Sequence, residues 1–216
     1  MTYSEFKIQF QTFPLIQTKD IYLFSGKHKD KQILFNQLNR WQKRKLVVKL
    51  KKSLYLLNQN DRKIHPGRAF LANQLYAPSY VSLEYALNFY GLIPEKVVDI
   101  TSVTTKKTNV FKNEEGHFIY QHIKREAYTG FRSLKDEEGL TFFMAHPEKA
   151  MVDFLYLNLN RFDVDVRNVF NESFRFQNLD ILRKGKLLEY VKPFHNKKLT
   201  RLVHSLQGFI KHESAP

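Results

Sequence analysis

The chain has 216 residues, of which 43% are hydrophobic and 14% aromatic, so its composition is that of a globular protein with a sizeable core. It has no cysteine, which excludes disulfide bonds and thiolate metal sites. No stretch approaches the roughly 20 apolar residues needed to cross a bilayer, and the start lacks the pattern of a signal peptide. We therefore expect a cytoplasmic protein without a membrane partner.

The formal net charge of +14 is concentrated near the amino terminus. Residues 1–68 hold 15 lysines and arginines against four acidic residues, a net charge of +11, so the rest of the chain carries only +3. Between Lys27 and Lys52, ten cationic residues accompany a single acid, Asp30. Charge gathered on one segment indicates a polyanionic partner, with nucleic acid favoured over a membrane surface. A basic surface that only keeps the protein in solution is the alternative.

Three helices are expected in residues 1–57. The first two are predicted over residues 3–13, from aromatic residues at helical spacing, and over residues 19–24, from a threonine at the N-cap. The third helix can be capped by Asp30, and its apolar residues recur at helical intervals. These residues are predicted to form its buried stripe: Ile33, Leu34, Leu38 and Trp41.

A basic hairpin is predicted directly after the third helix. The period of the apolar residues changes there from 3.6 to 2, which indicates strands over residues 45–50 and 53–57. Lys51 and Lys52 are expected in the turn. Three helices followed by a hairpin is the layout of a winged helix-turn-helix, whose last helix enters the major groove of DNA while the hairpin, or wing, lies along phosphates.

The side chains opposite the apolar stripe of the third helix are candidates for reading bases, because amides suit adenine and a guanidinium suits guanine. They are Gln32, Asn36, Asn39, Arg40 and Lys43. The lysines of the hairpin would hold phosphates, and Arg44 completes the predicted DNA-binding set. These lysines are Lys45, Lys49, Lys51 and Lys52. A solvated amphipathic helix before a surface hairpin is the alternative interpretation.

Residues 58–67 are polar and contain a Pro-Gly pair, so they are predicted to link the first unit to an α+β domain over residues 68–216. One helix of this domain should be capped by Ser82 and end at Gly91, and another should begin at Pro147. Runs rich in β-branched and aromatic residues predict an antiparallel or mixed sheet. Its strands are expected over residues 97–105, 108–111, 117–123, 128–131 and 140–145.

The carboxyl-terminal part is predicted to hold three or four helices from Asp163 onward. One carries Val166, Val169, Phe170 and Phe174, and the last has a buried stripe of Leu199, Leu202, Val203, Leu206 and Ile210. The predicted fold class is therefore α+β, with a winged helix-turn-helix, a mixed α/β domain and a helical end.

The alternating aromatic residues of the predicted sheet admit two interpretations. They are Phe118, Tyr120, Tyr128 and Phe131. They could form a platform on which single-stranded RNA stacks, or they could belong to the core. Aromatic residues alternating along strands are more often core residues, and we expect that here.

No constellation of residues indicates an enzyme. Asp163 and Asp165 could bind a divalent metal ion, but the upstream Gly-Ser turn and the third carboxylate of nucleotidyl transfer are missing, so helix capping is favoured. Glu148, Lys149 and Asp153 could suggest a nuclease-like set, but Glu148 and Asp153 do not share a helix face. The eight histidines show no zinc-protease spacing, and no phosphate-binding glycine motif occurs. We expect no catalytic residue, no cofactor and no metal site.

Several segments resemble those of a known family. They are residues 76–95 (YAPSYVSLEYALNFYGLIPE), 100–107 (ITSVTTKK), the strand around 118–120, and 146–157 (HPEKAMVDFLYL). Their order and spacing resemble AbiEi-type antitoxins of type IV toxin–antitoxin (abortive infection) systems, over about residues 30–160. The wing of that family usually has glycine where Ser53 stands here, and glycine tolerates a positive φ more readily than serine.

The resemblance implies a transcriptional repressor that is also an antitoxin of phage defence. Family members bind the promoter of their own operon through an amino-terminal winged helix, and the following domain counteracts a nucleotidyltransferase-like toxin without needing a stable complex. The implied partners are double-stranded operator DNA and such a toxin. Two alternatives stay open: a stand-alone regulator whose second domain senses a ligand or self-associates, and a nucleic-acid-modifying enzyme.

Overall fold

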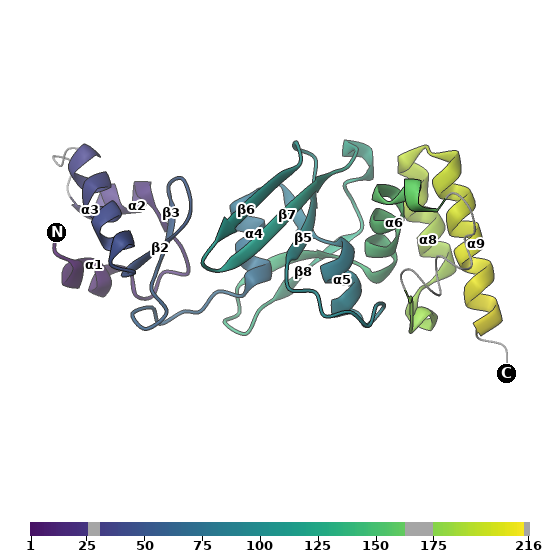
Figure 1. Ribbon diagram of the computed structural model, residues 1–216, viewed down its shortest axis with the longest axis horizontal. Coiled ribbons are helices and arrows are strands. Elements are labelled where there is room, and N and C mark those ends of the chain that lie inside the picture. The colour runs from purple at the N-terminus through teal and green to yellow at the C-terminus, as the bar shows by residue number, and fades with distance from the viewer. Residues whose placement is uncertain (26–30, 163–174, 214–216) are drawn as a thin grey trace.

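The structure of the protein is a computed structural model that describes residues 1–25, 31–162 and 175–213. Its long axis runs from the amino-terminal helices to the carboxyl-terminal helices (Figure 1). A small sheet lies beside the amino-terminal helices, and a larger sheet occupies the middle of the molecule. The fold is a mixed α+β arrangement, as the sequence predicted.

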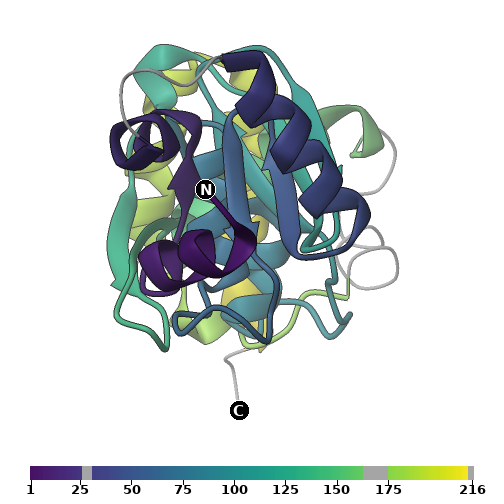
Figure 2. The ribbon, with the colours of Figure 1, turned by 90° about the vertical axis from the view of Figure 1, so that its left-hand side faces the viewer.

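The amino-terminal unit, residues 1–57, combines helices with a small sheet. In chain order its elements are α1 (Tyr3–Phe10), β1 (Ile16–Gln17), α2 (Thr18–Ser25), α3 (Lys31–Lys43), β2 (Val47–Lys51) and β3 (Leu54–Leu57). The strands are antiparallel and lie in the order β1-β3-β2. Viewed from the amino-terminal end, the helices lie around these strands (Figure 2).

The hairpin forms, but its boundaries differ from the prediction. Lys45 has a φ of +56° and ends α3, because Leu46 N donates to the carbonyl oxygen of Trp41 at 2.9 Å, so β2 begins only at Val47. Lys51 lies in β2, and the turn consists of Lys52 and Ser53. Ser53 takes a φ of +64°, the conformation for which glycine is usual.

The core of the amino-terminal unit confirms most of the stripe predicted for the third helix. Leu34, Leu38 and Trp41 are buried, whereas Ile33 is 60% exposed, so its predicted burial was wrong. The ring of Trp41 packs edge-on against Tyr3, with their centroids 5.6 Å apart. The predicted cap Asp30 lies outside the described residues.

The second unit follows from residue 68. It contains α4 (Arg68–Leu75), β4 (Ser79–Val81), α5 (Leu83–Phe89), β5 (Ile100–Thr104), β6 (Asn109–Asn113), β7 (Gly116–His122), β8 (Phe131–Lys135), β9 (Thr141–Ala145), α6 (Pro147–Leu157), α8 (Lys184–Val191) and α9 (Lys197–Glu213). Short 3-10 turns are η1 (Arg125–Ala127), η2 (Leu159–Arg161), η4 (Leu179–Ile181) and η5 (Lys192–Phe194).

The larger sheet is mixed, with the strand order β6-β7-β5-β4-β9-β8. The pairs β5–β7 and β4–β9 are parallel, and the other neighbours are antiparallel. Helix α4 lies against one face, where Tyr120 donates to the carbonyl oxygen of Ala72 at 2.6 Å. Helices α5 and α6 cover part of the other face, where Thr101 contacts α5. Of the four aromatic residues expected in the core, two are buried, Phe118 and Tyr120, while Tyr128 and Phe131 are half-buried and pack against it.

Several predictions for the second unit need correction. The strand expected over 128–131 is wrong, because η1 precedes a loop there and β8 begins only at Phe131; β4 was not predicted at all. Ser82 occupies the N-cap position of α5, but its hydroxyl makes no cap bond. Thr101 of the neighbouring strand caps the helix instead, since its Oγ1 accepts a hydrogen bond from Tyr85 N at 3.0 Å.

Most predictions for the helices of the second unit are confirmed. Helix α6 begins at Pro147, and α5 is followed by Gly91 with a φ of +68°, both as predicted. The predicted stripe of α9 is buried throughout: Leu199, Leu202, Val203, Leu206 and Ile210. The helix predicted to carry Val166 and Phe170 lies outside the described residues.

Candidate nucleic-acid interface

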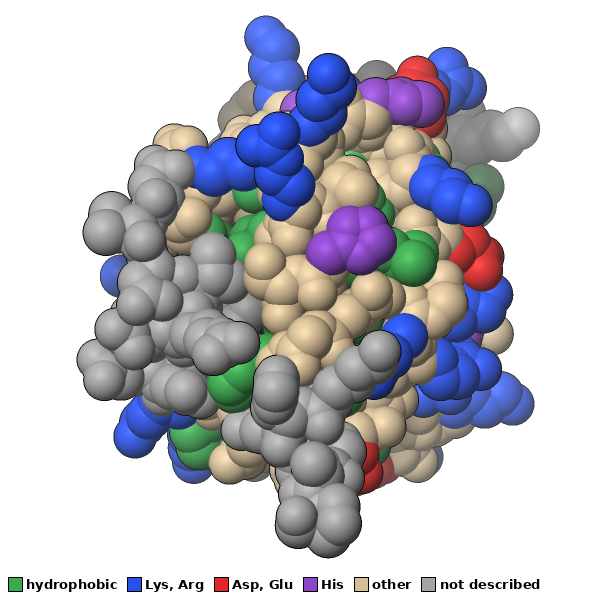
Figure 3. Space-filling model, turned by 90° about the vertical axis from the view of Figure 1, so that its right-hand side faces the viewer, with side chains coloured by type: hydrophobic (Ala, Val, Ile, Leu, Met, Phe, Trp, Pro, Cys, Tyr) green, Lys and Arg blue, Asp and Glu red, His purple; other side chains and the backbone are tan. Residues whose placement is uncertain are grey.

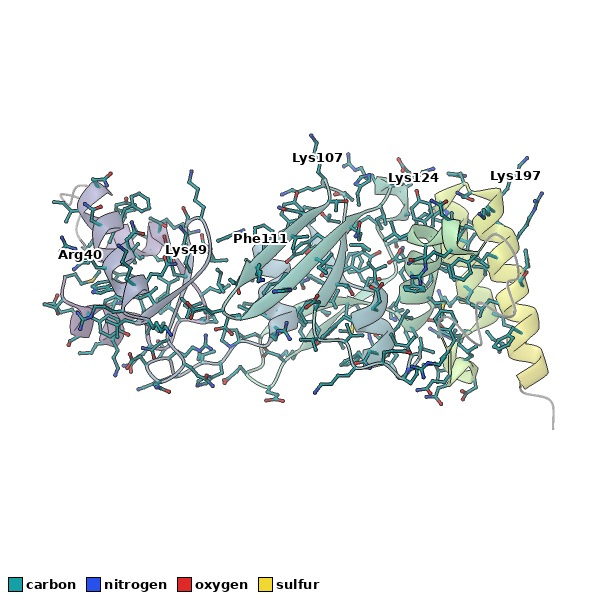
Figure 4. The ribbon with its side chains drawn as sticks, in the orientation of Figure 1. Arg40, Lys49, Lys107, Phe111, Lys124 and Lys197 are labelled. Atoms are coloured by element: carbon teal, nitrogen blue, oxygen red, sulfur yellow. The ribbon has the colours of Figure 1, made fainter. Side chains whose placement is uncertain are left out.

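Helix α3 presents a polar face to solvent. Its apolar stripe fixes the rotation of the helix, because Leu34, Leu38 and Trp41 are held in the core. All five side chains predicted to read bases are therefore exposed together: Gln32, Asn36, Asn39, Arg40 and Lys43. Figure 4 shows Arg40 on the outer side of the molecule.

Two amides of this face are already aligned. Gln32 Nε2 donates a hydrogen bond to Asn36 Oδ1 at 3.1 Å, one helical turn apart. The bond leaves the Asn36 amide nitrogen with its two hydrogens as donors. Amide and guanidinium groups at one-turn spacing can contact successive base edges in a groove wide enough to admit a helix.

The basic residues after α3 divide into two groups. Arg44, Lys45, Lys49 and Lys52 are exposed. Lys51 is half-buried, and its Nζ donates to the carbonyl oxygens of Leu75 at 2.7 Å and Gln74 at 3.2 Å, at the end of α4. Burial, followed by the nearby charge of Lys106, lowers the pKa of Lys51. The Lys51 ammonium thus binds the end of a helix in the second unit, and its predicted phosphate contact stays a prediction.

A second group of exposed cations was not predicted. Exposed cations of the β5–β6 turn, the residues after β7 and the start of α9 form what we call the basic edge: Lys106, Lys107, Lys124, Arg125 and Lys197. Lys107, Lys124 and Lys197 lie along the same upper edge of the molecule (Figure 4). Figure 3 shows lysine and arginine side chains along the upper part of the carboxyl-terminal end.

Contacts between neighbouring elements make the basic edge continuous. The His122 ring bonds to the carbonyl oxygen of Lys106 at 2.9 Å, and Lys124 Nζ donates to the carbonyl oxygen of Phe194 at 3.1 Å. The Lys-Lys pairs at 106–107 and 197–198 are visible in the sequence. The low net charge of this half concealed them, because acids balance the total; most lie elsewhere, as in the β8–β9 turn, while Glu126 lies beside Arg125.

A buried polar cluster occupies the middle of the second unit. The Lys149 ammonium donates to one carboxylate oxygen of Asp153, while Tyr80 and Ser82 donate to the other, each at 2.9 Å. Burial lowers the pKa of Lys149 and raises that of Asp153, and each partner opposes the other's shift. The side chains of Lys149 and Asp153 are both fully buried, so they cannot meet a substrate.

Glu148 does not join this cluster. It is 1% exposed and accepts hydrogen bonds from the Arg183 backbone nitrogen at 3.2 Å and from Arg183 Nε at 2.9 Å. Those bonds, led by the one from the guanidinium, outweigh burial and lower the pKa of Glu148. Glu148 therefore connects α6 to the start of α8, while Asp153 binds Lys149, and the two carboxylates have separate partners.

A cavity of about 640 Å³ opens on the α5 side of the larger sheet. Its floor includes Ile119 and Leu157, and Glu84, Lys96 and Gln121 contribute polar groups. A concave site of this size with a few polar groups is typical of small-molecule binding.

The described part of the chain holds neither a cluster of metal ligands nor a helix that could span a membrane. No group of three potential metal ligands occurs among residues 1–25, 31–162 and 175–213, and Asp163 and Asp165 lie outside them. Within the same residues no helix is long and apolar enough to cross a membrane. The sequence matches no protein-family model and no curated protein significantly. The DNA-binding part of the function is therefore argued from the chain's own geometry and charges.

Proposed function

We propose that the protein is a DNA-binding autoregulator that also acts as the antitoxin of a type IV toxin–antitoxin system. Its amino-terminal unit would be a winged helix-turn-helix. The element order α1-β1-α2-α3-β2-β3 and the strand order β1-β3-β2 support this assignment. The observation that carries it is the exposed amide and arginine face of α3, followed directly by a hairpin with exposed lysines.

In this proposal α3 enters the major groove. Asn36, Asn39 and Arg40 would contact base edges, and Lys49 and Lys52 would contact phosphates next to the groove. The basic edge would add further phosphate contacts without reading sequence. Aligned amides on a helix held by its own core reduce the entropy lost on binding.

The antitoxin role rests on the resemblance of residues 76–157 to AbiEi-type antitoxins. The second unit would oppose a nucleotidyltransferase-like toxin at its target. The Lys149–Asp153 pair in this unit is fully enclosed, so in this proposal it holds structural elements together.

The deciding experiment measures binding of a duplex that covers the promoter of the protein's own operon, alongside a random duplex. Asn36→Ala or Arg40→Ala is expected to cost about 1–3 kcal/mol on the promoter and much less on random DNA. Gln9→Ala, an exposed polar position on α1, serves as the control and should leave both affinities unchanged. Equal losses on both duplexes would show that α3 does not read sequence.

Rescue of growth on co-expression with the neighbouring toxin gene tests the second activity separately. The Asn36→Ala variant should still rescue, because its change lies on the DNA-reading face. Loss of rescue together with loss of DNA binding would mean that antitoxicity acts through repression alone.

The cavity beside Ile119 favours a second candidate function, a regulator that senses a small molecule. Replacing Gln121, whose side chain lines the cavity, would then alter repression by the intact protein without changing toxin rescue. A nucleotidyltransferase gene beside this one would favour the antitoxin, and an isolated gene would favour the regulator.

A further inference from the structure

The small sheet of the amino-terminal unit is buried on both of its faces. On one face, Val47, Tyr55 and Leu57 pack with α1 and α3. On the other face, the side chains belong to the hydrophobic core of the second unit: Val48, Leu50, Leu54 and Leu56. The same two strands therefore complete two cores, and the exposed lysines of the hairpin, Lys49 and Lys52, are left to contact a partner.

Polar contacts fix this sheet against the second unit. Asn113 Nδ2, at the end of β6, donates to the carbonyl oxygen of Leu50 at 3.1 Å. From β2, the Lys51 ammonium binds the carbonyl oxygens of Gln74 and Leu75 at the end of α4. Strand β2 is thus held by β6 on one side and by α4 on the other.

The segment predicted as a linker is bonded to both units. Asp61 forms an ion pair with Lys7 at 2.5 Å and accepts a hydrogen bond from the Tyr3 hydroxyl at 2.7 Å. One residue later, Arg62 forms an ion pair with Glu115 of the β6–β7 turn at 3.0 Å, and their side chains are 9% and 19% exposed. A segment bonded to both units transmits the orientation of one to the other.

Further backbone bonds continue this attachment. Gly67 N donates to Asp136 Oδ2 at 2.8 Å, and His65 N donates to Glu138 Oε1 at 3.0 Å. The acids of the β8–β9 turn thus hold the end of the segment, and they lie away from α3.

We propose that this shared sheet, held by Asn113 and Lys51 and supported by the Arg62–Glu115 ion pair of the connecting segment, is a rigid joint through which the second unit sets the orientation of α3 and of the β2–β3 turn. Asn113 and Glu115 are then positioning residues: they influence the affinity for DNA without touching it. The inference rests on the proposed DNA-binding function for that effect, while the rigidity of the joint is independent of it.

The test uses the full chain, which contains no cysteine, so two spin labels can be attached without background. Lys19→Cys on α2 and His204→Cys on α9 are exposed and lie at opposite ends of the molecule. The distribution of distances between the labels is measured together with the affinity for the promoter duplex. Glu114→Ala is the matched control, because it removes the same charge from the same turn.

Asn113→Ala combined with Glu115→Ala should broaden the distance distribution and weaken promoter binding by about 3- to 30-fold. The salt dependence of binding should stay unchanged, because no phosphate contact is lost. Glu114→Ala should leave the distribution narrow and the affinity undiminished. If the double variant folds poorly, Asn113→Ala alone can be used. It should also broaden the distance distribution and weaken promoter binding, to a smaller extent.

An unchanged distance distribution in the double variant would overturn the proposal, and so would an affinity loss that Glu114→Ala reproduces. If the unaltered protein binds no DNA, the proposed function fails. The distance distributions then still decide whether the joint is rigid.

Discussion

The hydroxyl of Tyr80 donates a hydrogen bond to the carboxylate of Asp153 at 2.9 Å, which ties strand β4 to helix α6 in the middle of the second unit. The same carboxylate binds the ammonium of Lys149, four residues earlier on α6. Burial of both charges makes their mutual neutralisation essential, because an isolated charge in the interior is costly.

Asp153→Asn is therefore expected to destabilise the protein by about 3–5 kcal/mol, since it leaves the Lys149 charge without its counter-charge. Urea unfolding at neutral pH measures the loss. The double variant Lys149→Met with Asp153→Leu should recover part of the loss, because both charges are removed together while the buried hydroxyls of Tyr80 and Ser82 lose their acceptor. A loss well under about 1 kcal/mol in Asp153→Asn would show that the pair is not ionised in the folded protein.

The ion pair of Asp61 with Lys7 predicts a pH dependence of stability. Hydrogen bonds from Lys7 and Tyr3 lower the pKa of the Asp61 carboxyl below its usual value. Its stabilisation is therefore complete above the unfolded-state pKa and is lost as the pH falls through the folded-state pKa.

Asp61→Asn should cost about 1 kcal/mol or less at neutral pH, because the site is near the surface. The difference in free energy of unfolding between the variant and the unaltered protein should shrink as the pH is lowered from about 6 to about 2. Chemical denaturation at several pH values measures it. Asp180→Asn, at an exposed acid, is the control, and a difference that grows in acid would contradict the assignment.

The lysines of the hairpin should differ in what they contribute. Lys49→Ala combined with Lys52→Ala should weaken binding to promoter and random duplexes alike and reduce the salt slope by about one to two. Lys51→Ala should instead lower the free energy of unfolding, because it removes the ammonium that binds the end of α4. If Lys51→Ala reduced the salt slope as much as Lys52→Ala does, Lys51 would be a phosphate contact after all.

The basic edge should matter for affinity and not for sequence preference. Lys107→Ala combined with Lys197→Ala is expected to reduce the salt slope of binding by about one to two. It should weaken binding to the promoter duplex and to the random duplex by the same factor. Lys135→Ala combined with Lys63→Ala, at exposed lysines that are not part of that edge, provides a control of equal charge. An equal effect of both double variants would indicate general charge attraction with no preferred edge.

The sequence determined the elements whose burial follows a local period. The stripes of α3 and α9 could be predicted because apolar side chains three and four residues apart share a helix face. Pro147 and Gly91 marked helix ends because their backbone preferences act locally. The concentration of positive charge near the amino terminus could be counted from the sequence. The exposed face of α3 that carries Asn36 and Arg40 could be predicted as the side opposite the apolar stripe.

The tertiary structure decided everything that depends on a partner distant in sequence. Ile33 belongs to the apolar pattern of α3 but is exposed, because the helix rotation that buries Leu34, Leu38 and Trp41 leaves it outside. Thr101 of strand β5 caps α5, the role predicted for Ser82. Lys51, predicted in the turn of the hairpin, binds the end of α4. The spacing of residues in the sequence determines which face of a helix or strand a side chain occupies. The tertiary structure determines whether that face packs against another element or is exposed to solvent.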